Sequence, residues 1–451
     1  MAKAQTIAAY EYCKLYRGGD LRTHEEVSLP EKTFDLLWDY VEQNEDAENV
    51  DKIMSINHKG RKFIRLSKYV GTVQTSDGVT IEVLPKIYKA SEGTIVDAKS
   101  CRRVFLEMLK HFNDTNALSF QNASISTSKD FPLLEVYISN YLDALDNLLT
   151  MGLKKGYTQV EENSNFLKGK LLVSQNIRRN AVDQSKFYIR HSEYMEDIPQ
   201  NRILMSTLNR LMDLTNSAAN EGRIYAIQGR MGDIPVSSNI ENDLRACKSG
   251  NRLFSAYNQL LDWSEHILHG EGFTAFAGPT VNLALFFSAE SLFESYVAYL
   301  FTEYAKKNGG WSIHPQHTAY YLVDEHRDKG GIFKLRPDIV AISDNDNNDV
   351  RILDTKWKIV NAKDMRGNYG ISQADMYQLY AYGQKYRIKN DNNNPQLTLL
   401  YPATDKFNKE QIIEEFIYDD VESGLKIKAV PFDLSDKETY NVQIDNILNI
   451  P

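Results

Sequence analysis

Two aspartates, Asp338 and Asp354, lie in matching positions on either side of a polar loop. The loop, residues 343–349, is rich in Asp and Asn, and apolar runs flank it: Arg336-Pro337-Asp338-Ile339-Val340 and Ile352-Leu353-Asp354-Thr355-Lys356-Trp357-Lys358. This pattern predicts an antiparallel hairpin. If the hairpin is symmetric about its loop, the two aspartates face each other across the ladder. Opposed like charges destabilise a sheet, so we expect a cation between them, and two carboxylates suit Mg²⁺ with room for water and a phosphate.

The second strand of this hairpin carries a cation beside its aspartate. Side chains alternate along a strand, so Asp354 and Lys356 share one face, and Leu353, Thr355, Trp357 and Ile359 are expected on a buried face. Lys356 would then lie beside a water that attacks a phosphate. The alternative is an exposed hairpin with ordinary surface charges, because Asp-x-Lys alone is very common. The Pro-Asp pair, the spacing and Leu-Asp-Thr-Lys together favour the site.

Two predicted helices flank the hairpin. The apolar stripe of residues 283–301 predicts an amphipathic helix, with Glu294 at the stripe's edge, pointing either to solvent or to a metal. Ser372-x-x-Asp375 resembles a capping box that opens a second helix, on which Gln378 and Tyr382 share a face. These two side chains either support the same site or belong to an ordinary tyrosine-rich surface helix.

The composition is that of a globular protein with two or three domains: 451 residues, 42% hydrophobic, with a net charge of −9. Such a charge argues against nucleic-acid binding over the whole surface. From Val350 to Asn390, however, eight Lys/Arg against three Asp/Glu give +5, which fits a phosphate-bearing substrate. Three scattered cysteines, the lack of a signal peptide and the lack of a long apolar run lead us to expect a cytoplasmic protein without a membrane span.

Three regions are expected along the chain. Residues 1–100 alternate strand-like runs and turns and predict a β-rich domain. Residues 101–270 are mainly helical, and residues 271–451 contain the hairpin and its helices. Within the middle region, the basic segment 168–190 interleaves aromatics with cations, which either follow a nucleic-acid backbone or form a solvated face. The candidate DNA contacts are Lys168, Lys170, Arg178 and Arg179, together with Lys358 near the hairpin.

The order Glu294, Asp338, Asp354-x-Lys356, Gln378-x-x-x-Tyr382 resembles the PD-(D/E)xK nuclease superfamily, in the branch whose following helix carries Gln-x-x-x-Tyr. More narrowly, the chain resembles the McrC family, the nuclease subunits of McrBC-type modification-dependent restriction systems. The N-terminal half adds Ile81-Glu82-Val83-Leu84-Pro85-Lys86 and Asn201-Arg202-Ile203-Leu204. Family members often have Tyr where Trp357 stands.

This resemblance implies an α/β fold whose C-terminal nuclease core is a mixed sheet flanked by helices. It implies that Asp338, Asp354 and the backbone carbonyl of Thr355 ligate Mg²⁺, with Glu294 as a further acidic member. Lys356 would orient the attacking water, and Gln378 and Tyr382 would support the site.

The same resemblance implies partners. They are an McrB-type AAA+ GTPase hexamer, on which residues 1–100 dock and whose GTP hydrolysis they stimulate, and double-stranded DNA. The chain itself has no P-loop motif. The residues leave two other functions open: a stand-alone RecB-like repair nuclease, and a chain that mainly regulates the partner GTPase.

Overall fold

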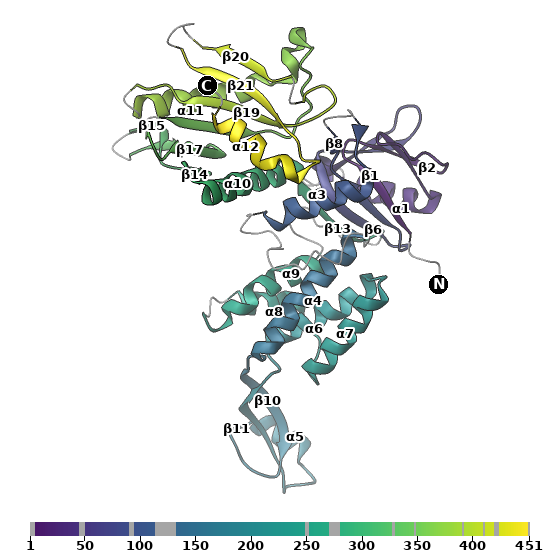
Figure 1. Cartoon of the computed structure of the whole chain (residues 1–451). Coiled ribbons are helices and arrows are strands. Elements are labelled where there is room, and N and C mark those ends of the chain that lie inside the picture. The colour runs from purple at the N-terminus through teal and green to yellow at the C-terminus, as the bar shows by residue number, and fades with distance from the viewer. Residues whose placement is uncertain are drawn as a thin grey trace. The chain divides into compact units, whose positions relative to one another are not determined.

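A computed structural model describes residues 5–44, 50–89, 94–112, 132–248, 252–269, 280–326, 330–346, 349–389, 392–408, 411–418 and 424–449. The chain forms two compact units (Figure 1). One consists of Phe131–Leu285, and the other joins Gln5–Asp130 to Phe286–Pro451. The N-terminal and C-terminal segments thus share a unit, and the expected division into three regions at residues 100 and 270 stays a prediction.

The N-terminal segment is built on two small sheets, as its strand-like runs predicted. The first has the order β1-β7-β6-β13 and the second β3-β2-β5-β4. The strands of this segment are β1 Thr6–Tyr10, β2 Lys14–Arg17, β3 Glu26–Leu29, β4 Met54–Asn57, β5 Phe63–Leu66, β6 Tyr69–Thr75 and β7 Thr80–Leu84, with a short pair β8 Tyr88–Lys89 and β9 Thr94–Ile95. The fourth strand of the first sheet, β13 Val281–Ser288, comes from much later in the chain. The helices are α1 Glu31–Gln43, α2 Val50–Ile53 and α3 Ala98–Lys110.

The other unit combines a helical bundle with a small sheet. Its helices are α4 Leu133–Met151, α5 Val173–Arg179, α6 Pro199–Leu214, α7 Ala218–Met231, α8 Ile240–Cys247, the 3₁₀ helix η2 Arg252–Tyr257 and α9 Asn258–His269. The sheet has the order β10-β12-β11, with β10 Gly156–Ser164, β11 Lys170–Leu171 and β12 Phe187–Met195. The basic segment 168–190 therefore belongs to a sheet with one short helix, inside a region expected to be mainly helical.

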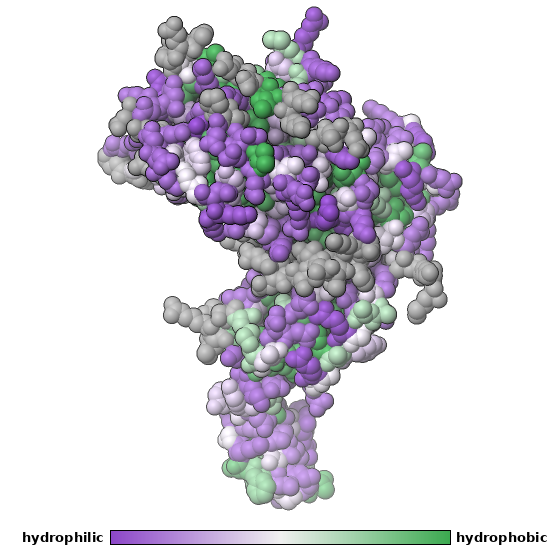
Figure 2. Space-filling view, viewed as in Figure 1, coloured by the Kyte–Doolittle hydropathy of each residue, from purple (hydrophilic) through white to green (hydrophobic). Residues whose placement is uncertain are grey.

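This small sheet carries apolar side chains on its surface. Figure 2 shows hydrophobic colour at its end, where α5 and β11 lie in Figure 1. The exposed large apolar residues of this region include Phe166, Leu167, Val173, Ile177 and Val182. Clusters of this kind mark interaction surfaces more often than free surface.

The C-terminal segment is a six-stranded mixed sheet in the order β14-β17-β18-β19-β21-β20. The strands are β14 Trp311–Pro315, β17 Ile339–Ser343, β18 Val350–Thr355, β19 Gln396–Pro402, β20 Ile413–Ile417 and β21 Lys426–Phe432, with a separate pair β15 Tyr321–Val323 and β16 Ile332–Lys334. The helices are α10 Ala289–Asn308, α11 Gln373–Lys389 and α12 Tyr440–Asn449, with 3₁₀ turns η3 Met365–Gly370 and η4 Lys437–Thr439. A mixed sheet flanked by helices is the fold class that the sequence predicted.

Tyr382 and Leu379 of α11 pack into the core of this sheet with Ile352, Leu397 and Leu399. The helix begins where the capping box predicted, because Ser372 Oγ accepts the Asp375 N–H at 3.2 Å. The predicted start of the preceding helix, at residue 283, is wrong. Residues 281–288 form β13, and α10 begins at Ala289 after Ser288 caps it. A short apolar run does not distinguish a buried strand from a helix by periodicity alone.

Candidate active site

The predicted hairpin forms with the predicted register. β17 pairs antiparallel with β18, and Ile339 lies opposite Leu353. One residue further, the same register places Asp338 opposite Asp354. Asp338 Oδ2 accepts hydrogen bonds from the Thr355 N–H at 2.7 Å and the Thr355 hydroxyl at 2.8 Å. Burial raises the pKa of Asp338, while these hydrogen bonds act in the opposite direction.

Asp354 is fully buried at the end of β18. Among the described residues, Oδ1 has no hydrogen-bond donor, and Oδ2 faces the Lys356 ammonium. Its ion-pair partner is the Lys356 ammonium. Burial, and then the charge of Asp338, raise the pKa of Asp354 to about 7. Buried carboxylates are normally well satisfied by donors, so this one has spare coordination for a cation.

Lys356 lies where the alternation predicted, against Asp354. Its side chain is buried, and its Nζ also donates to the Thr355 carbonyl oxygen at 3.3 Å. Burial alone would lower the pKa of Lys356, but Asp354 and then Asp338 outweigh it and raise the pKa. The backbone N–H of Lys356 donates to Leu400 of β19 at 2.9 Å, which fixes the chain after β18 ends. The site therefore holds a fixed, charged lysine.

Glu294 of α10 belongs to the same cluster. Burial, followed by the charge of Asp338, raises its pKa, so the helix brings this carboxylate into electrostatic reach of the hairpin. Gln316 Nε2 donates to Glu294 Oε1 at 2.8 Å. Of the two options that the sequence left for Glu294, solvent or a metal, the choice stays a prediction.

Gln316 was not identified from the sequence, yet it contacts three members of the site. Besides Glu294, its side-chain oxygen accepts from the Arg336 guanidinium, and its backbone N–H donates to the Asp338 carbonyl at 2.7 Å. Its φ is +45°, which non-glycine residues adopt with strain and which recurs at functional sites. Gln316 reaches this place because β14 pairs with β17, Pro315 opposite Ile339. No sequence motif signals such a pairing.

Gln378 and Tyr382 share a face of α11, as predicted. Gln378 Nε2 donates to the Tyr382 hydroxyl at 2.8 Å, and that hydroxyl donates to the Arg336 carbonyl at 3.1 Å. The pair thus anchors the backbone just before Pro337 and Asp338.

The residues after Lys356 depart partly from the strand pattern. Trp357 is buried as expected, but Ile359 is 53% exposed. The prediction of Ile359 on the core face is wrong, because β18 ends at Thr355 and the alternation ends with it. Lys358 pairs with Asp375 at 2.7 Å and donates to Ser372 Oγ at 3.3 Å. Lys358 therefore contacts two residues at the start of α11. Its contact with DNA stays a prediction.

The candidate DNA contacts of segment 168–190 lie in the other compact unit. Lys170 and Arg178 are exposed, Lys168 pairs with Glu162 at 3.0 Å, and Arg179 lies over the Tyr188 ring at 4.5 Å. Part of the basic charge is therefore engaged within the region, and DNA binding here stays a prediction.

The oxygen donors of the hairpin fit a hard cation. Within the described ranges, no group of three or more His, Cys, Asp or Glu side chains is arranged to hold a metal by itself. Mg²⁺ needs no such group, since it commonly uses one or two carboxylates and keeps several waters. The under-coordinated oxygens of Asp354 and the nearby Asp338 meet that requirement.

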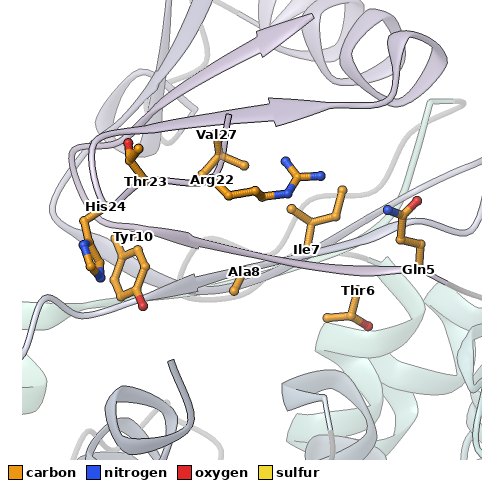
Figure 3. A pocket seen from close by; sticks show the side chains of 9 residues that line it. All are labelled: Gln5, Thr6, Ile7, Ala8, Tyr10, Arg22, Thr23, His24 and Val27. Atoms are coloured by element: carbon orange, nitrogen blue, oxygen red, sulfur yellow. The ribbon is translucent and has the colours of Figure 1, made fainter. Parts of the chain in front are cut away.

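A separate cavity lies in the N-terminal segment. It has a volume of about 320 Å³ and is lined by β1 together with residues such as Arg22, His24 and Val27 (Figure 3). None of the residues predicted to act in catalysis lines it. The candidate site is therefore the hairpin cluster and not this cavity.

A family model described as McrBC 5-methylcytosine restriction system component matches residues 64–402. The chain belongs to this family. This family match confirms the predicted resemblance to the McrC family. No curated protein sequence matches the chain.

A solved structure with a TM-score above 0.5 gives the same fold. The chain is similar to one from a half-complex of a tetradecameric assembly of Thermococcus gammatolerans McrB AAA+ hexamers with bound McrC. The two chains share 17% sequence identity with a TM-score of 0.61, and the match covers 98% of this chain and 100% of that one. A chain of the Thermococcus gammatolerans McrBC complex matches at 18% identity and a TM-score of 0.46, over 66% of this chain and 88% of that one. No helix among the described residues of this McrBC component is long and apolar enough to cross a membrane.

Proposed function

We propose that this McrBC component is the Mg²⁺-dependent DNA endonuclease subunit of its restriction complex. The observation that carries the proposal is Asp354: a fully buried carboxylate that lies opposite Asp338, with Oδ2 against the Lys356 ammonium and Oδ1 without a donor among the described residues. Opposed carboxylates repel each other, and burial disfavours their charged form. A hairpin with a purely structural role would have no reason to keep two carboxylates in an arrangement that costs free energy.

Each residue has a defined task in this proposal. Asp338, Asp354 and the Thr355 carbonyl would hold Mg²⁺, with Glu294 beside them. When bound, Mg²⁺ polarises the scissile phosphate and makes its water a better nucleophile. Lys356, held cationic, orients the attacking water and offsets charge that develops on the phosphate oxygens. Tyr382 and Gln316 hold the backbone on either side of Asp338.

We also propose the partners that the family resemblance implies. The similar solved assembly contains McrB AAA+ hexamers with bound McrC, and an AAA+ GTPase ring of that kind would recognise and deliver double-stranded DNA to this chain. The net charge of −9 supports delivery by a partner, because an acidic protein attracts DNA poorly by itself. Residues 1–100 would dock on the ring, and the complex would work in the cytoplasm.

A reconstituted cleavage assay tests this function. The purified chain is incubated with methylated DNA and Mg²⁺, with and without an McrB-type AAA+ GTPase. We expect cleavage only when chain, GTPase, GTP and Mg²⁺ are all present. Cleavage by the chain alone would instead support a stand-alone repair nuclease, and GTPase stimulation without any cleavage would support a regulator.

Gln316→Gly is expected to slow cleavage by roughly 10-fold, because the side-chain contacts to Glu294 and Arg336 are lost while the backbone N–H to Asp338 and the metal ligands remain. Glycine adopts a φ of +45° without strain, so the melting temperature should change little. Single-turnover rates and thermal unfolding measure both. Gln5→Gly, at a site outside the cluster, is the control, and a Gln316→Gly variant that cuts at the wild-type rate would contradict the assigned role.

A further inference from the structure

A buried hydrogen bond joins the N-terminal segment to the catalytic strand. The Trp357 indole Nε1 donates to Glu11 Oε2 at 2.7 Å, across 346 positions of sequence. Glu11 is 2% exposed and Trp357 5%. Trp357 directly follows Lys356, so this bond lies one residue from the proposed reaction centre.

Glu11 is itself held rigidly. Its other carboxylate oxygen, Oε1, accepts the Lys86 N–H at 2.9 Å, and its own N–H donates to the Leu84 carbonyl at 3.0 Å. Both oxygens thus have one N–H donor each. Burial raises the pKa of Glu11 to about 7, against these donors and the Lys86 charge. Burying a carboxylate costs free energy, even when it accepts a hydrogen bond from an indole. Packing alone therefore gives no reason to retain Glu11 at this position.

Trp357 is connected to two of the elements that carry acidic residues of the site, β18 and α10. Along the chain it follows Asp354, Thr355 and Lys356 after β18 has ended. Through space its ring packs edge-on against Phe293 of α10, with centroids 5.4 Å apart, and Phe293 precedes Glu294. The orientation of one indole therefore sets where the end of β18 lies relative to α10.

From these contacts we infer that Glu11 is a positioning residue for the nuclease reaction, acting through Trp357 on Lys356 and Asp354. The inference rests on the proposed function. Beyond it, the inference assigns a role in cleavage to a residue of the N-terminal segment, far from every nuclease motif in sequence. A tyrosine or phenylalanine at position 357 has no indole N–H to meet Glu11, so this link depends on the tryptophan of this chain.

The test compares Glu11→Gln, Trp357→Phe and the double variant in the complete complex with GTPase, GTP, DNA and Mg²⁺. Glutamine keeps the size of Glu11 but offers one acceptor oxygen to two donors. We expect Glu11→Gln to lower kcat on the order of 10-fold or more, as small misplacements at reacting groups do, with KM for DNA and GTPase stimulation unchanged. The double variant should be no slower than the slower single variant, because both changes remove the same bond.

The matched control is Glu82→Gln, since Glu82 is also a fully buried carboxylate of the N-terminal segment, paired with Arg102. It should lower stability as much as Glu11→Gln does, yet leave kcat unchanged. A second readout is the melting temperature of the full chain, measured as the Mg²⁺ concentration is raised. The Mg²⁺ concentration at the midpoint of this rise should be higher for Glu11→Gln than for the wild type, and unchanged for Glu82→Gln.

Wild-type kcat in a folded Glu11→Gln variant, or additive effects in the double variant, would overturn the inference. An equal loss of kcat in Glu82→Gln would overturn it too, because the effect would then come from lost stability. If the wild-type complex neither cleaves DNA nor gains stability with Mg²⁺, the proposed function fails, and the inference falls with it. The wild-type reaction thus distinguishes the two failures.

Discussion

Asp354→Asn is expected to abolish DNA cleavage by the reconstituted complex, with a fall of at least about 1000-fold. The substitution preserves shape and removes the charge that would hold Mg²⁺. A catalytic metal supplies several kcal/mol of transition-state stabilisation, and each 1.4 kcal/mol is a factor of ten in rate. Single-turnover cleavage of methylated DNA at saturating GTPase and GTP measures the loss.

Assembly should survive this substitution, because Asp354 lies within the hairpin and its ion-pair partner is Lys356 of the same hairpin. GTPase stimulation and co-elution with the partner ring should therefore match the wild type. Asp349→Asn is the matched control in the same hairpin, where the aspartate pairs with Arg351 away from the cluster, and it should cut normally. If Asp354→Asn restricts DNA as well as the wild type, the chain acts on its partner and is not the nuclease.

Lys356→Met has the second largest expected effect, a fall in kcat of roughly 100- to 1000-fold, the range for loss of one preorganised electrostatic group. Methionine keeps the buried aliphatic volume and removes the ammonium that faces Asp354. In contrast to Asp354→Asn, this variant should still gain thermal stability from Mg²⁺. The carboxylates that would bind Mg²⁺ remain, and the Lys356 ammonium no longer competes with the metal for them.

Lys363→Met provides the control, since Lys363 is exposed in the turn that follows and lies outside the cluster. It should cleave within experimental error of the wild type. A Lys356→Met variant with full activity would exclude the lysine from the reaction. Loss of Mg²⁺-dependent stabilisation in the same variant would show that Lys356 acts on folding or metal binding, and not on the attacking water.

The sequence was most informative where spacing is local. The hairpin register follows from a polar loop between two apolar runs, and that register alone places Asp338 opposite Asp354. Strand alternation put Lys356 beside Asp354, and a spacing of one helical turn put Gln378 beside Tyr382. These relations hold because the strand period of two and the helix period of 3.6 fix neighbours within one element.

Local patterns failed where an element ends. The alternation stops at Thr355, which left Ile359 exposed. The apolar run before α10 became β13, since its residues pair into a sheet and Ser288 starts the helix only afterwards. A short run of apolar positions satisfies either period, and only the partner strand decides between them.

The sequence by itself determined the residues that the proposed chemistry needs: two carboxylates and a lysine on one hairpin, in an order that resembles the family to which the chain belongs. Only the tertiary structure decided how that chemistry is held. It added Gln316 through the β14–β17 pairing, directed Tyr382 to the Arg336 carbonyl, and joined Trp357 to Glu11. The physical reason is that these contacts link segments far apart along the chain, whose meeting depends on the packing of whole sheets and leaves no periodic signal in the residues themselves.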